Sequence, residues 1–319
     1  MDNSGTAIGS AVMEHRDTVP GQRFLLRIAD LTVEVTWDEG ISNPRVKGSK
    51  ERFIVHEGAP DVRISVVRGA LSEALMGRKL FDAGPAWQLY QYNGSYLFSF
   101  KSVDFGSHPY EIAVFNQDFS KGEIYLHPDF LKPGQPVDPL WPPLDELLYI
   151  NLLAKGKGVE IHACGLIDSE GLGHLFVGKS GAGKTTMAKL WEGVQGVTVL
   201  SDDRIILRQL GDKIWMYGTP WHGEGGMSVA SKAPLSRIYF LQKAENNELL
   251  PMKEAEAAAR LTACSFPPYY NREAMEFTLG FLSKVVKEAL CYELRVLPDK
   301  RVIEFISAHY YFLNRGWVS

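Results

Sequence analysis

Cysteines are few and scattered in this sequence, and their scarcity excludes two kinds of site. The three cysteines, Cys164, Cys264 and Cys291, lie far apart, and no Cys-x-x-Cys pair occurs. An odd number of distant cysteines supports neither a disulfide framework nor a cysteine-based zinc site. Reduced thiols of this kind are typical of a cytoplasmic protein, and we expect that location.

Concentrated positive charge and long apolar runs are also missing. The 34 lysines and arginines are outnumbered by 38 acidic residues, the net charge is −4, and no basic block occurs. A dedicated nucleic-acid surface needs clustered lysine and arginine, so no nucleic-acid partner is expected. No stretch approaches the roughly 18 apolar residues of a membrane-spanning helix, and the polar start of the chain lacks a signal-peptide pattern. We expect no membrane partner, and a disordered tail over residues 1–20.

The first half of the chain, residues 21–140, has the pattern of a mostly antiparallel β domain. Short alternating apolar runs are separated by turn residues, and Asn93-Gly94 between two aromatic-rich runs is typical of a hairpin. One helix is expected near residues 69–80. The histidines and aspartates of this half stand singly in the sequence, so no motif there indicates chemistry.

The second half, residues 141–319, follows a proline-rich linker and alternates strands with helices. Six prolines occur in residues 127–146, and proline fixes φ and removes a hydrogen-bond donor. The apolar spacing then predicts helices over 184–192, 253–264, 272–290 and 299–311, and strands over 159–164, 174–177, 197–200, 205–210, 213–217, 236–242 and 292–296. In the helix over 272–290, Leu279 and Leu282 are among the apolar residues expected to face the core. Such alternation is typical of an α/β domain with a parallel or mixed sheet.

A phosphate-binding loop stands in this second half. It is the run Gly178, Lys179, Ser180, Gly181, Ala182, Gly183, Lys184, Thr185, which fits GxxxxGK[ST] at every fixed position. The glycines let backbone amides face an anion, Lys184 reaches the β- and γ-phosphates, and the hydroxyl of Thr185 is a magnesium ligand. A predicted strand precedes the loop and a predicted helix follows it. We expect this loop, with Thr186, to bind a nucleoside triphosphate together with Mg²⁺.

An acidic pair follows the loop closely. The short apolar strand over 197–200 leads into Asp202 and Asp203, and Asp202 comes 18 residues after Lys184. That interval leaves room for one helix and one turn, so the acidic strand is the next strand in sequence. A strand end of this kind is where a magnesium-binding acid of a phosphate-loop enzyme belongs. Two adjacent carboxylates allow one to hold the metal while the other takes a proton from an attacking hydroxyl.

The order of His162, the phosphate loop and the Asp202-Asp203 pair resembles the HPr kinase/phosphorylase family and its relative PEP carboxykinase. The resemblance covers roughly residues 159–224 and implies a P-loop nucleotide-binding domain of that fold over 141–319. It also implies ATP as the likeliest nucleotide. By position, it implies that Lys184 contacts phosphate and Thr185 the metal. It further implies proton transfer by Asp202, a metal-side role for Asp203, and a place for His162 near the transferred phosphate.

One departure separates the chain from true HPr kinases. Their second signature, built around Glu-Ile-Arg-Gly, is replaced here by the glycine-rich loop over 217–226. Neither HPr as the substrate nor the reverse phosphorylase activity is therefore expected. In this loop Glu224 is a candidate metal ligand and His222 a candidate contact to phosphate or acceptor, and the alternative is a surface loop packed by Trp221. Further candidate cations for the γ-phosphate are Lys179, Arg204, Lys232 and Arg237.

The sequence thus predicts a magnesium-dependent kinase of the HPr-kinase-like kind. It would transfer a phosphoryl group to a serine-type hydroxyl of a protein, a peptide or a small molecule. Two alternatives stay open: a nucleotide-gated regulatory or peptide-binding module without phosphotransfer, and an ATPase that needs no acceptor. The sequence does not name the assembly state, and a homo-oligomer stays open as well.

Overall fold

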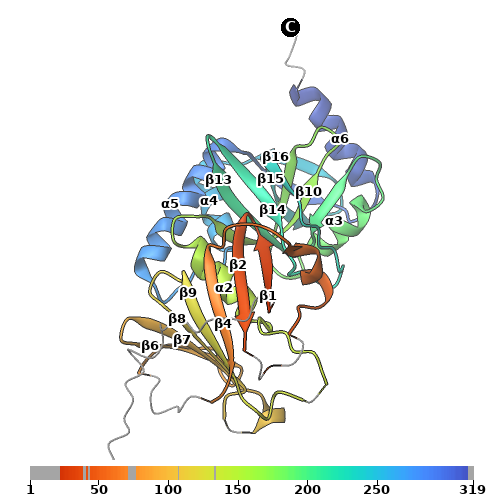
Figure 1. Ribbon diagram of the computed structural model, residues 1–319. Helices are drawn as coiled ribbons and strands as arrows, with labels where there is room; N and C mark the ends of the chain where they lie inside the picture. The colour runs from red at the N-terminus through yellow and green to blue at the C-terminus, as the bar shows by residue number, and fades with distance from the viewer. Residues whose placement is uncertain are drawn as a thin grey trace, which may run out of the picture. The chain divides into compact units, whose positions relative to one another are not determined.

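The protein has a mixed α/β architecture with two large sheets. The computed structural model describes residues 22–38, 41, 44–70, 77–106, 108–132 and 134–314, and the expected tail over 1–20 lies outside them (Figure 1). The chain divides into two compact units, residues 1–149 and 150–319, each of which has its own sheet. None of the helices in the described ranges is long and apolar enough to cross a membrane.

The first unit is built on a nine-stranded sheet with the order β3-β1-β2-β4-β9-β8-β7-β6-β5. The strands are β1 (Arg23–Ile28), β2 (Leu31–Trp37), β3 (Ile54–Val55), β4 (Val62–Arg68), β5 (Arg78–Asp82), β6 (Trp87–Tyr92), β7 (Ser95–Phe100), β8 (Glu111–Phe115) and β9 (Lys121–Leu126). Among these strands, β4 pairs in parallel with β2 and with β9, and the other pairings are antiparallel. The prediction of a mostly antiparallel β region is confirmed.

Two local predictions for the first unit have different outcomes. The hairpin is confirmed: Tyr92 pairs with Ser95, and the turn residues Asn93 and Gly94 have φ of 48° and 80°. Both positive values match the tight turn that Asn-Gly favours. The helix expected near 69–80 is wrong at its end, because residues 78–82 form the strand β5, and residues 71–76 lie outside the described ranges.

The second unit contains an eight-stranded sheet and the helices that cover it. Its elements are β10 (Val159–Ile167), β11 (Gly173–Val177), α3 (Lys184–Trp191), β12 (Thr198–Ser201), β13 (Arg204–Leu210), β14 (Lys213–Gly218), β15 (Lys232–Lys243), β16 (Glu248–Pro251), α4 (Glu254–Thr262), α5 (Arg272–Glu288), β17 (Leu290–Val296) and α6 (Arg301–Asn314). The predicted strands and helices are confirmed in type and place, whereas β16 was not predicted. The helix α2 (Leu144–Leu153) runs across the division between the two units.

Two long strands, β10 and β15, hold this sheet together because each changes partner along its length. The first part of β10 pairs with β13 and the second part with β11 and β12. The start of β15 pairs with β14, and its continuation pairs in parallel with β11 and β17. The mixed sheet predicted for this half is therefore confirmed.

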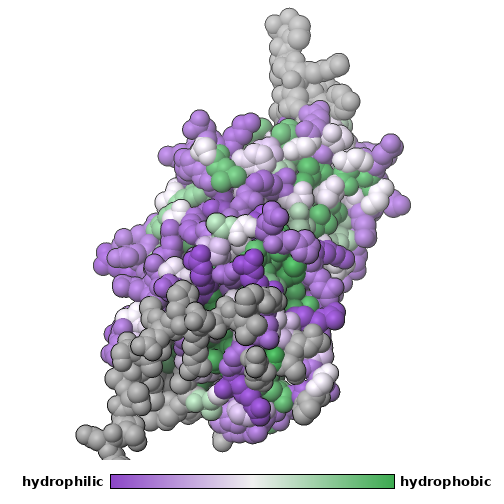
Figure 2. All heavy atoms as spheres, in the orientation of Figure 1, coloured by the Kyte–Doolittle hydropathy of each residue, from purple (hydrophilic) through white to green (hydrophobic). Residues whose placement is uncertain are grey.

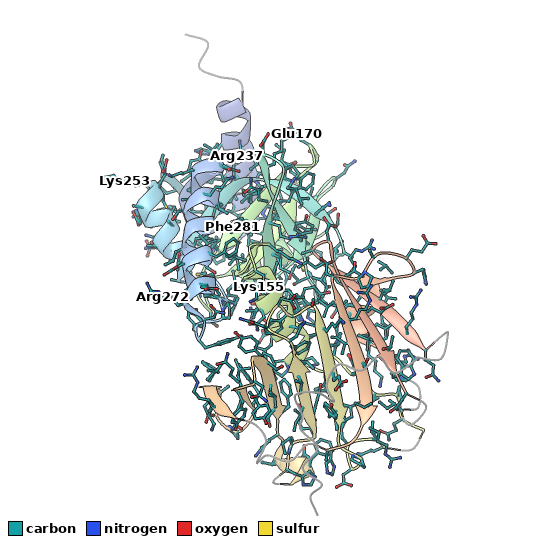
Figure 3. The ribbon with its side chains drawn as sticks, turned by 60° about the vertical axis from the view of Figure 1, so that its left-hand side comes forward. Lys155, Glu170, Arg237, Lys253, Arg272 and Phe281 are labelled. Atoms are coloured by element: carbon teal, nitrogen blue, oxygen red, sulfur yellow. The ribbon has the colours of Figure 1, made fainter. Side chains whose placement is uncertain are left out.

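Helices cover both faces of the sheet. The helices α4 and α5 lie together on one side in Figure 1, and α3 and α6 lie on the other. Phe281, labelled in Figure 3, projects from α5 toward the sheet, whereas Arg272 at the start of the helix points outward. Each fully buried side chain of this size stabilises the fold by about 1.5–3 kcal/mol relative to exposure.

One predicted core position of α5 is wrong. Leu279 is 48% exposed, and the buried face carries Thr278, Phe281, Leu282 and Val285. The apolar residues of α5 form a broad stripe, because Phe277 and Phe281 widen it on the side away from Leu279. The buried face is therefore rotated away from the side that the prediction chose. On the face drawn in Figure 2, hydrophilic residues cover most of the described surface, with hydrophobic residues in small groups between them.

Candidate active site

The ends of three strands meet beside the middle of β10. Val177 ends β11, Ser201 ends β12 and Arg204 begins β13, and all three pair with residues 162–165 of β10. This topology brings the loop that follows β11 and the acidic pair that follows β12 to one place. The two motifs that the sequence singled out are therefore neighbours in space.

Residues 178–183 of the phosphate loop connect β11 to α3 in a conformation that depends on glycine. Gly181 and Gly183 have φ of 79° and 109°, which side chains other than glycine rarely adopt. A Cβ atom on Gly178 would lie 2.6 Å from the Cβ atom of Ala182. Gly183 is the N-cap of α3 and offers no side-chain hydrogen bond to the first amides of the helix. Those amides carry the positive end of the helix dipole and suit a phosphate group.

Lys184 is the first residue of α3, and its side chain lies across the loop. The residue is 6% exposed, and Nζ donates to the carbonyl oxygens of Gly178 at 2.9 Å and Lys179 at 3.3 Å. Burial lowers the pKa of Lys184, and the negative charge of Asp203 opposes that effect. The ammonium group thus forms hydrogen bonds with the loop itself. A phosphate bound in the loop can replace the two carbonyl oxygens as its partners.

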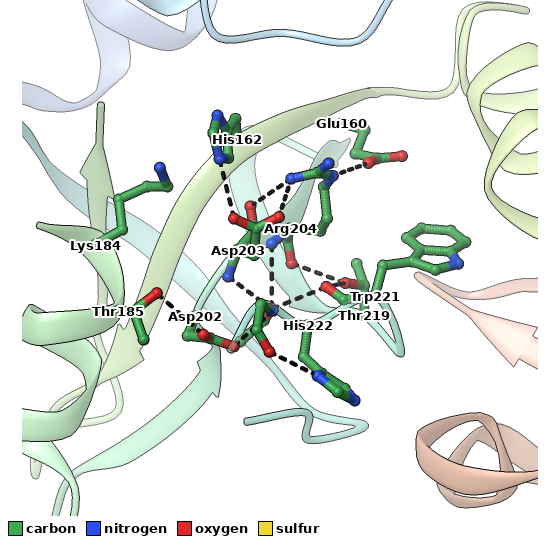
Figure 4. Close-up of polar contacts among 12 residues, drawn as sticks. Glu160, His162, Lys184, Thr185, Asp202, Asp203, Arg204, Thr219, Trp221 and His222 are labelled. Carbon is green, nitrogen blue, oxygen red and sulfur yellow. Dashed lines mark hydrogen bonds and ion pairs between the residues drawn. The ribbon is translucent and has the colours of Figure 1, made fainter. Parts of the chain in front are cut away.

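Asp202 is fully buried and accepts hydrogen bonds from two other segments. Thr185 Oγ1 lies 3.3 Å from Asp202 Oδ2. The backbone amides of Gly223 and Gly225 donate to Asp202 Oδ1 at 3.0 Å and to Oδ2 at 2.9 Å (Figure 4). A Cβ atom on Gly225 would lie 2.6 Å from Asp202 Oδ2, and one on Gly223 2.9 Å from it. Glycine at both positions is therefore what lets the two amides reach the carboxylate.

Asp203 faces a different set of partners. Its Oδ1 lies 3.0 Å from Nε2 of His162, and Oδ2 forms a short ion pair with Arg204. Burial would raise the pKa of Asp203, but the hydrogen bond with His162 and the charges of Arg204 and Lys184 outweigh it, and the pKa is lowered. His162 and Asp203 are 21% and 23% exposed in their side chains, so both can be reached from solvent.

Arg204 is itself held in place by the fold. Its Nε lies 3.3 Å from Oε1 of Glu160, which is 1% exposed, and its guanidinium lies 4.3 Å from the ring centre of Phe266. A buried carboxylate on one side and an aromatic face on the other fix the cation beside Asp203. Among the four candidate cations, Arg204 thus joins the acidic pair, whereas Lys232 packs over Trp215.

The remaining predicted residues lie at the surface around this centre. Exposed residues of the loop and of the first turn of α3 are Lys179, Ser180, Gly181 and Thr186. His222 is exposed, and its Nδ1 lies 2.9 Å from the carbonyl oxygen of Gly223. Glu224 is also exposed, between the two glycines whose amides hold Asp202. The 217–226 loop thus reaches the acidic pair through its backbone.

Several residues that order the site were not predicted. Ser201 Oγ accepts the amides of Asp203 and Arg204 at 3.3 and 3.2 Å and so fixes the acidic turn. Thr219 Oγ1 donates to the carbonyl oxygen of Arg204 at 2.8 Å. The serine directly before two aspartates was a usable signal for a turn, because serine often bonds nearby amides. Nothing in the local sequence points to Thr219.

Comparison with known proteins finds similarity only at the level of structure. No family model matches the chain, and no curated protein matches it. Among solved structures, the HPr(Ser) kinase/phosphatase from Coxiella burnetii matches at 14% identity and a TM-score of 0.22. The match covers 48% of this chain and 97% of that one. It marks a weak fold relationship only.

The donor set suits magnesium and a polyphosphate. Thr185 and Asp202 present a hydroxyl and a carboxylate oxygen side by side, and hard oxygen ligands are the ones that Mg²⁺ takes. The uncapped amides of α3 and the ammonium group of Lys184 suit phosphate oxygens. The His162–Asp203 pair adds a proton-accepting group beside them. The residues present therefore fit both groups.

Proposed function

We propose that this chain is a magnesium-dependent kinase that transfers the γ-phosphoryl group of a nucleoside triphosphate, with ATP the preferred donor, to a hydroxyl acceptor. The acceptor class is a serine-type hydroxyl of a protein, a peptide or a small molecule. The observation that carries the proposal is the 3.3 Å contact between Thr185 Oγ1 and Asp202 Oδ2. This contact connects the end of the glycine-rich loop, which can bind phosphates, with a carboxylate that can bind the same metal ion as Thr185. A second carboxylate, Asp203, is next in sequence.

The loop and Lys184 bind the triphosphate. The amides of residues 178–185 donate to phosphate oxygens, and Lys184 exchanges its two carbonyl partners for the β- and γ-phosphates. Thr185 and Asp202 would hold Mg²⁺, which when bound neutralises charge on the β- and γ-phosphate oxygens. Phosphoryl transfer needs mainly this positioning and charge neutralisation.

The geometry favours an exchange of the roles expected for the two aspartates. Asp202 is fully buried and both of its oxygens receive backbone amides, so it is less open to an acceptor molecule than the partly exposed Asp203. It is also the carboxylate that contacts Thr185, the expected metal hydroxyl. Asp203 is partly exposed and paired with His162. We therefore assign the metal side to Asp202 and proton transfer to Asp203 with His162.

Asp203 and His162 orient the acceptor in this scheme. The lowered pKa of Asp203 keeps its carboxylate ionised at neutral pH, in the form that accepts a hydrogen bond from the acceptor hydroxyl. The acceptor oxygen forms a bond to the γ-phosphorus, the bond from that phosphorus to the β–γ bridging oxygen breaks, and the hydroxyl proton passes to the Asp203–His162 pair. The products are the phosphorylated acceptor and a nucleoside diphosphate. Arg204 faces the same carboxylate and adds positive charge near the transferred group.

The exchange of roles predicts opposite phenotypes for two single substitutions. Asp203→Asn should leave the affinity for a magnesium-bound, non-hydrolysable ATP analogue unchanged and lower transfer of ³²P from γ-labelled ATP about 10²- to 10⁴-fold. Asp202→Asn should weaken binding of the same analogue about 10- to 100-fold in the presence of Mg²⁺, since a charged hydrogen-bonding group is lost. If the two phenotypes are reversed, the roles are those that the family resemblance implies.

The acceptor requirement separates the kinase from its alternatives. The assay supplies free serine, serine-containing peptides and protein fractions as acceptors, and it also tests ADP and pyrophosphate as donors. Transfer to one of these acceptors supports the kinase. Turnover without an acceptor supports an ATPase, and nucleotide binding without any turnover supports a nucleotide-gated regulatory or peptide-binding module.

A further inference from the structure

A cluster of two histidines and an aspartate lies in the first unit, far in sequence from the phosphate loop. His108 Nε2 and His127 Nδ1 each lie 3.6 Å from Asp129 Oδ2, and the two imidazole rings are 4.2 Å apart between centres. One potential ligand atom from each residue lies within 4.8 Å of those from the other two. The sequence showed these residues as single polar positions, and the fold brings them together.

The backbone around the cluster is ordered by the sheet. The amide of His127 donates to the carbonyl oxygen of Tyr110 at 2.9 Å, which continues the pairing of β8 with β9. The amide of Phe130 donates to the carbonyl oxygen of His127 at 2.9 Å and forms a turn that returns Asp129 toward the histidines. The rings of Phe105, Tyr110 and Phe130 pack together next to this turn, with centres 5.1 to 5.5 Å apart. The three polar side chains thus lie beside a packed aromatic cluster, on backbone that continues the sheet pairing.

The spacing of the three groups is too long for hydrogen bonds and suits a shared metal ion. At 3.6 Å, neither histidine nitrogen forms a hydrogen bond with the carboxylate. Two ligands at about 2.0–2.1 Å from a tetrahedral zinc ion lie about 3.3 Å apart. His108 Nε2 is buried and has no hydrogen-bond partner among the described residues, although a buried polar atom normally has one. A metal ion would satisfy it.

The chemistry of the ligands selects the kind of metal. Imidazole nitrogens suit Zn²⁺ and its neighbours in the first transition row, whereas Mg²⁺ and Ca²⁺ take oxygen ligands. His127 Nδ1 accepts the amide of Asp129 at 3.2 Å, so this nitrogen carries the lone pair that a metal requires. Binding there exchanges a long hydrogen bond for a ligand bond.

We propose that His108, His127 and Asp129 form a binding site for a divalent transition-metal ion of the Zn²⁺ kind. Three protein ligands leave a coordination position for water or for a ligand atom of another molecule. The ion links the segment before β8 to the turn after β9, and it stabilises this end of the sheet. The site is independent of the proposed kinase centre, because its ligands belong to another unit and another class of metal.

The test is zinc binding by the full chain in buffer that contains excess Mg²⁺, so that oxygen-ligand sites are occupied. Equilibrium dialysis followed by metal analysis should find one zinc ion bound per wild-type chain. The variants His108→Asn and His127→Asn should each lack this zinc ion. Loss of a neighbour that only orients a metal ligand weakens binding 10- to 100-fold, so loss of a ligand should cost at least about 100-fold. The matched control is His56→Asn, which replaces an exposed histidine of the same unit and should bind zinc as the wild type does.

A cobalt spectrum identifies the ligands separately from stability. Wild-type protein with Co²⁺ should show the visible d–d bands of nitrogen and oxygen ligation, without the near-ultraviolet charge-transfer band of a thiolate. Both histidine variants should lose these bands while keeping the far-ultraviolet circular dichroism of the wild type. The proposal is overturned if the wild-type chain retains no zinc, if the histidine variants retain as much as the wild type, or if the cobalt spectrum is that of a thiolate.

Discussion

Thr185 Oγ1 and Asp202 Oδ2 are 3.3 Å apart, although Thr185 lies in α3 and Asp202 in the turn after β12, 17 positions further along the chain. Asp202 also accepts the amides of Gly223 and Gly225, so one carboxylate connects the start of α3 to the 217–226 loop. Each of the three donors would lose its acceptor if this buried carboxylate were replaced or displaced. The structural and the chemical roles of this aspartate are therefore linked.

Asp202→Asn should destabilise the protein as well as weaken nucleotide binding. An amide nitrogen would face a backbone amide where an oxygen now accepts, and an unsatisfied buried donor costs about 1–3 kcal/mol. Urea unfolding measures the loss of unfolding free energy. Asp212→Asn, at an exposed position between β13 and β14, is the matched control and should unfold like the wild type. Equal stabilities of the two variants would contradict the role given to the glycine amides.

Gly225→Ala tests the same contact from the opposite side. The new Cβ atom would lie 2.6 Å from Asp202 Oδ2 and 3.2 Å from Cγ2 of Thr185, so the loop or the carboxylate must move. We expect Mg²⁺-dependent affinity for an ATP analogue to fall about tenfold or more, in line with the loss of one hydrogen bond to a charged group.

Gly226→Asn is the control for that substitution. Gly226 has φ of 69°, which asparagine tolerates, and a Cβ atom added at this position would have no neighbouring atom within 4 Å. Calorimetric titration of the analogue should give a near wild-type affinity for this variant. A normal affinity in Gly225→Ala would instead show that Asp202 does not depend on the amide of residue 225.

Lys184→Met should slow the proposed transfer about 10²- to 10³-fold while keeping the fold. The ammonium group is the charge that the loop offers to the β- and γ-phosphates, and loss of one such stabilising group costs about 10²–10³ in rate. Lys189→Met replaces an exposed lysine of the same helix and is expected to keep the wild-type rate. The ³²P transfer assay compares the two, and a rate for Lys184→Met within a few-fold of the control would exclude a role for Lys184.

Glu111 of β8 predicts a pH dependence of stability that is independent of the site. It is 1% exposed, and its two carboxylate oxygens have no hydrogen-bond partner among the described residues. Burial, reinforced by the charge of Asp138 and opposed by Lys50, raises the pKa of Glu111 well above 4.5. A raised folded-state pKa means that the folded state binds this proton more tightly than the unfolded state. The stability contributed by Glu111 is therefore present below pH 4.5 and is lost as pH rises through the folded-state pKa.

Glu111→Gln should remove this loss, because a neutral amide does not titrate. The difference in unfolding free energy between the variant and the wild type should increase from pH 5 to pH 8, as measured by urea unfolding of both proteins. Glu57→Gln, an exposed position of the same unit, should show no such trend. A pH-independent difference for Glu111→Gln would mean that Glu111 is not protonated in the folded state.

The sequence predicted what depends on local patterns. The strand before the phosphate loop, the helix after it and the strand before Asp202 are all confirmed, because short apolar runs and the glycine-rich loop between them mark these elements locally. The hairpin at Asn93-Gly94 is also confirmed, because Asn-Gly between two aromatic-rich runs is a local turn signal. The short strand β16 has four residues and no alternation long enough to detect.

The contacts within the site depend on topology that the sequence does not display. The amides of Gly223 and Gly225 reach Asp202 because β13 and β14 form a hairpin that returns the chain to the end of β12. The sequence drew attention to His222 and Glu224 in that loop, yet both side chains are exposed. Their roles stay predictions.

The central claim is that a triphosphate occupies the loop over 178–185 with magnesium at Thr185 and Asp202. The most direct measurement is a crystal structure of the protein with Mg²⁺ and a non-hydrolysable ATP analogue. The account predicts phosphate oxygens on the loop amides and Lys184, a metal ion bound by Thr185 and on the side of Asp202, and Asp203 facing the γ-phosphate. An analogue bound elsewhere, or a metal ion distant from both Thr185 and Asp202, would contradict it.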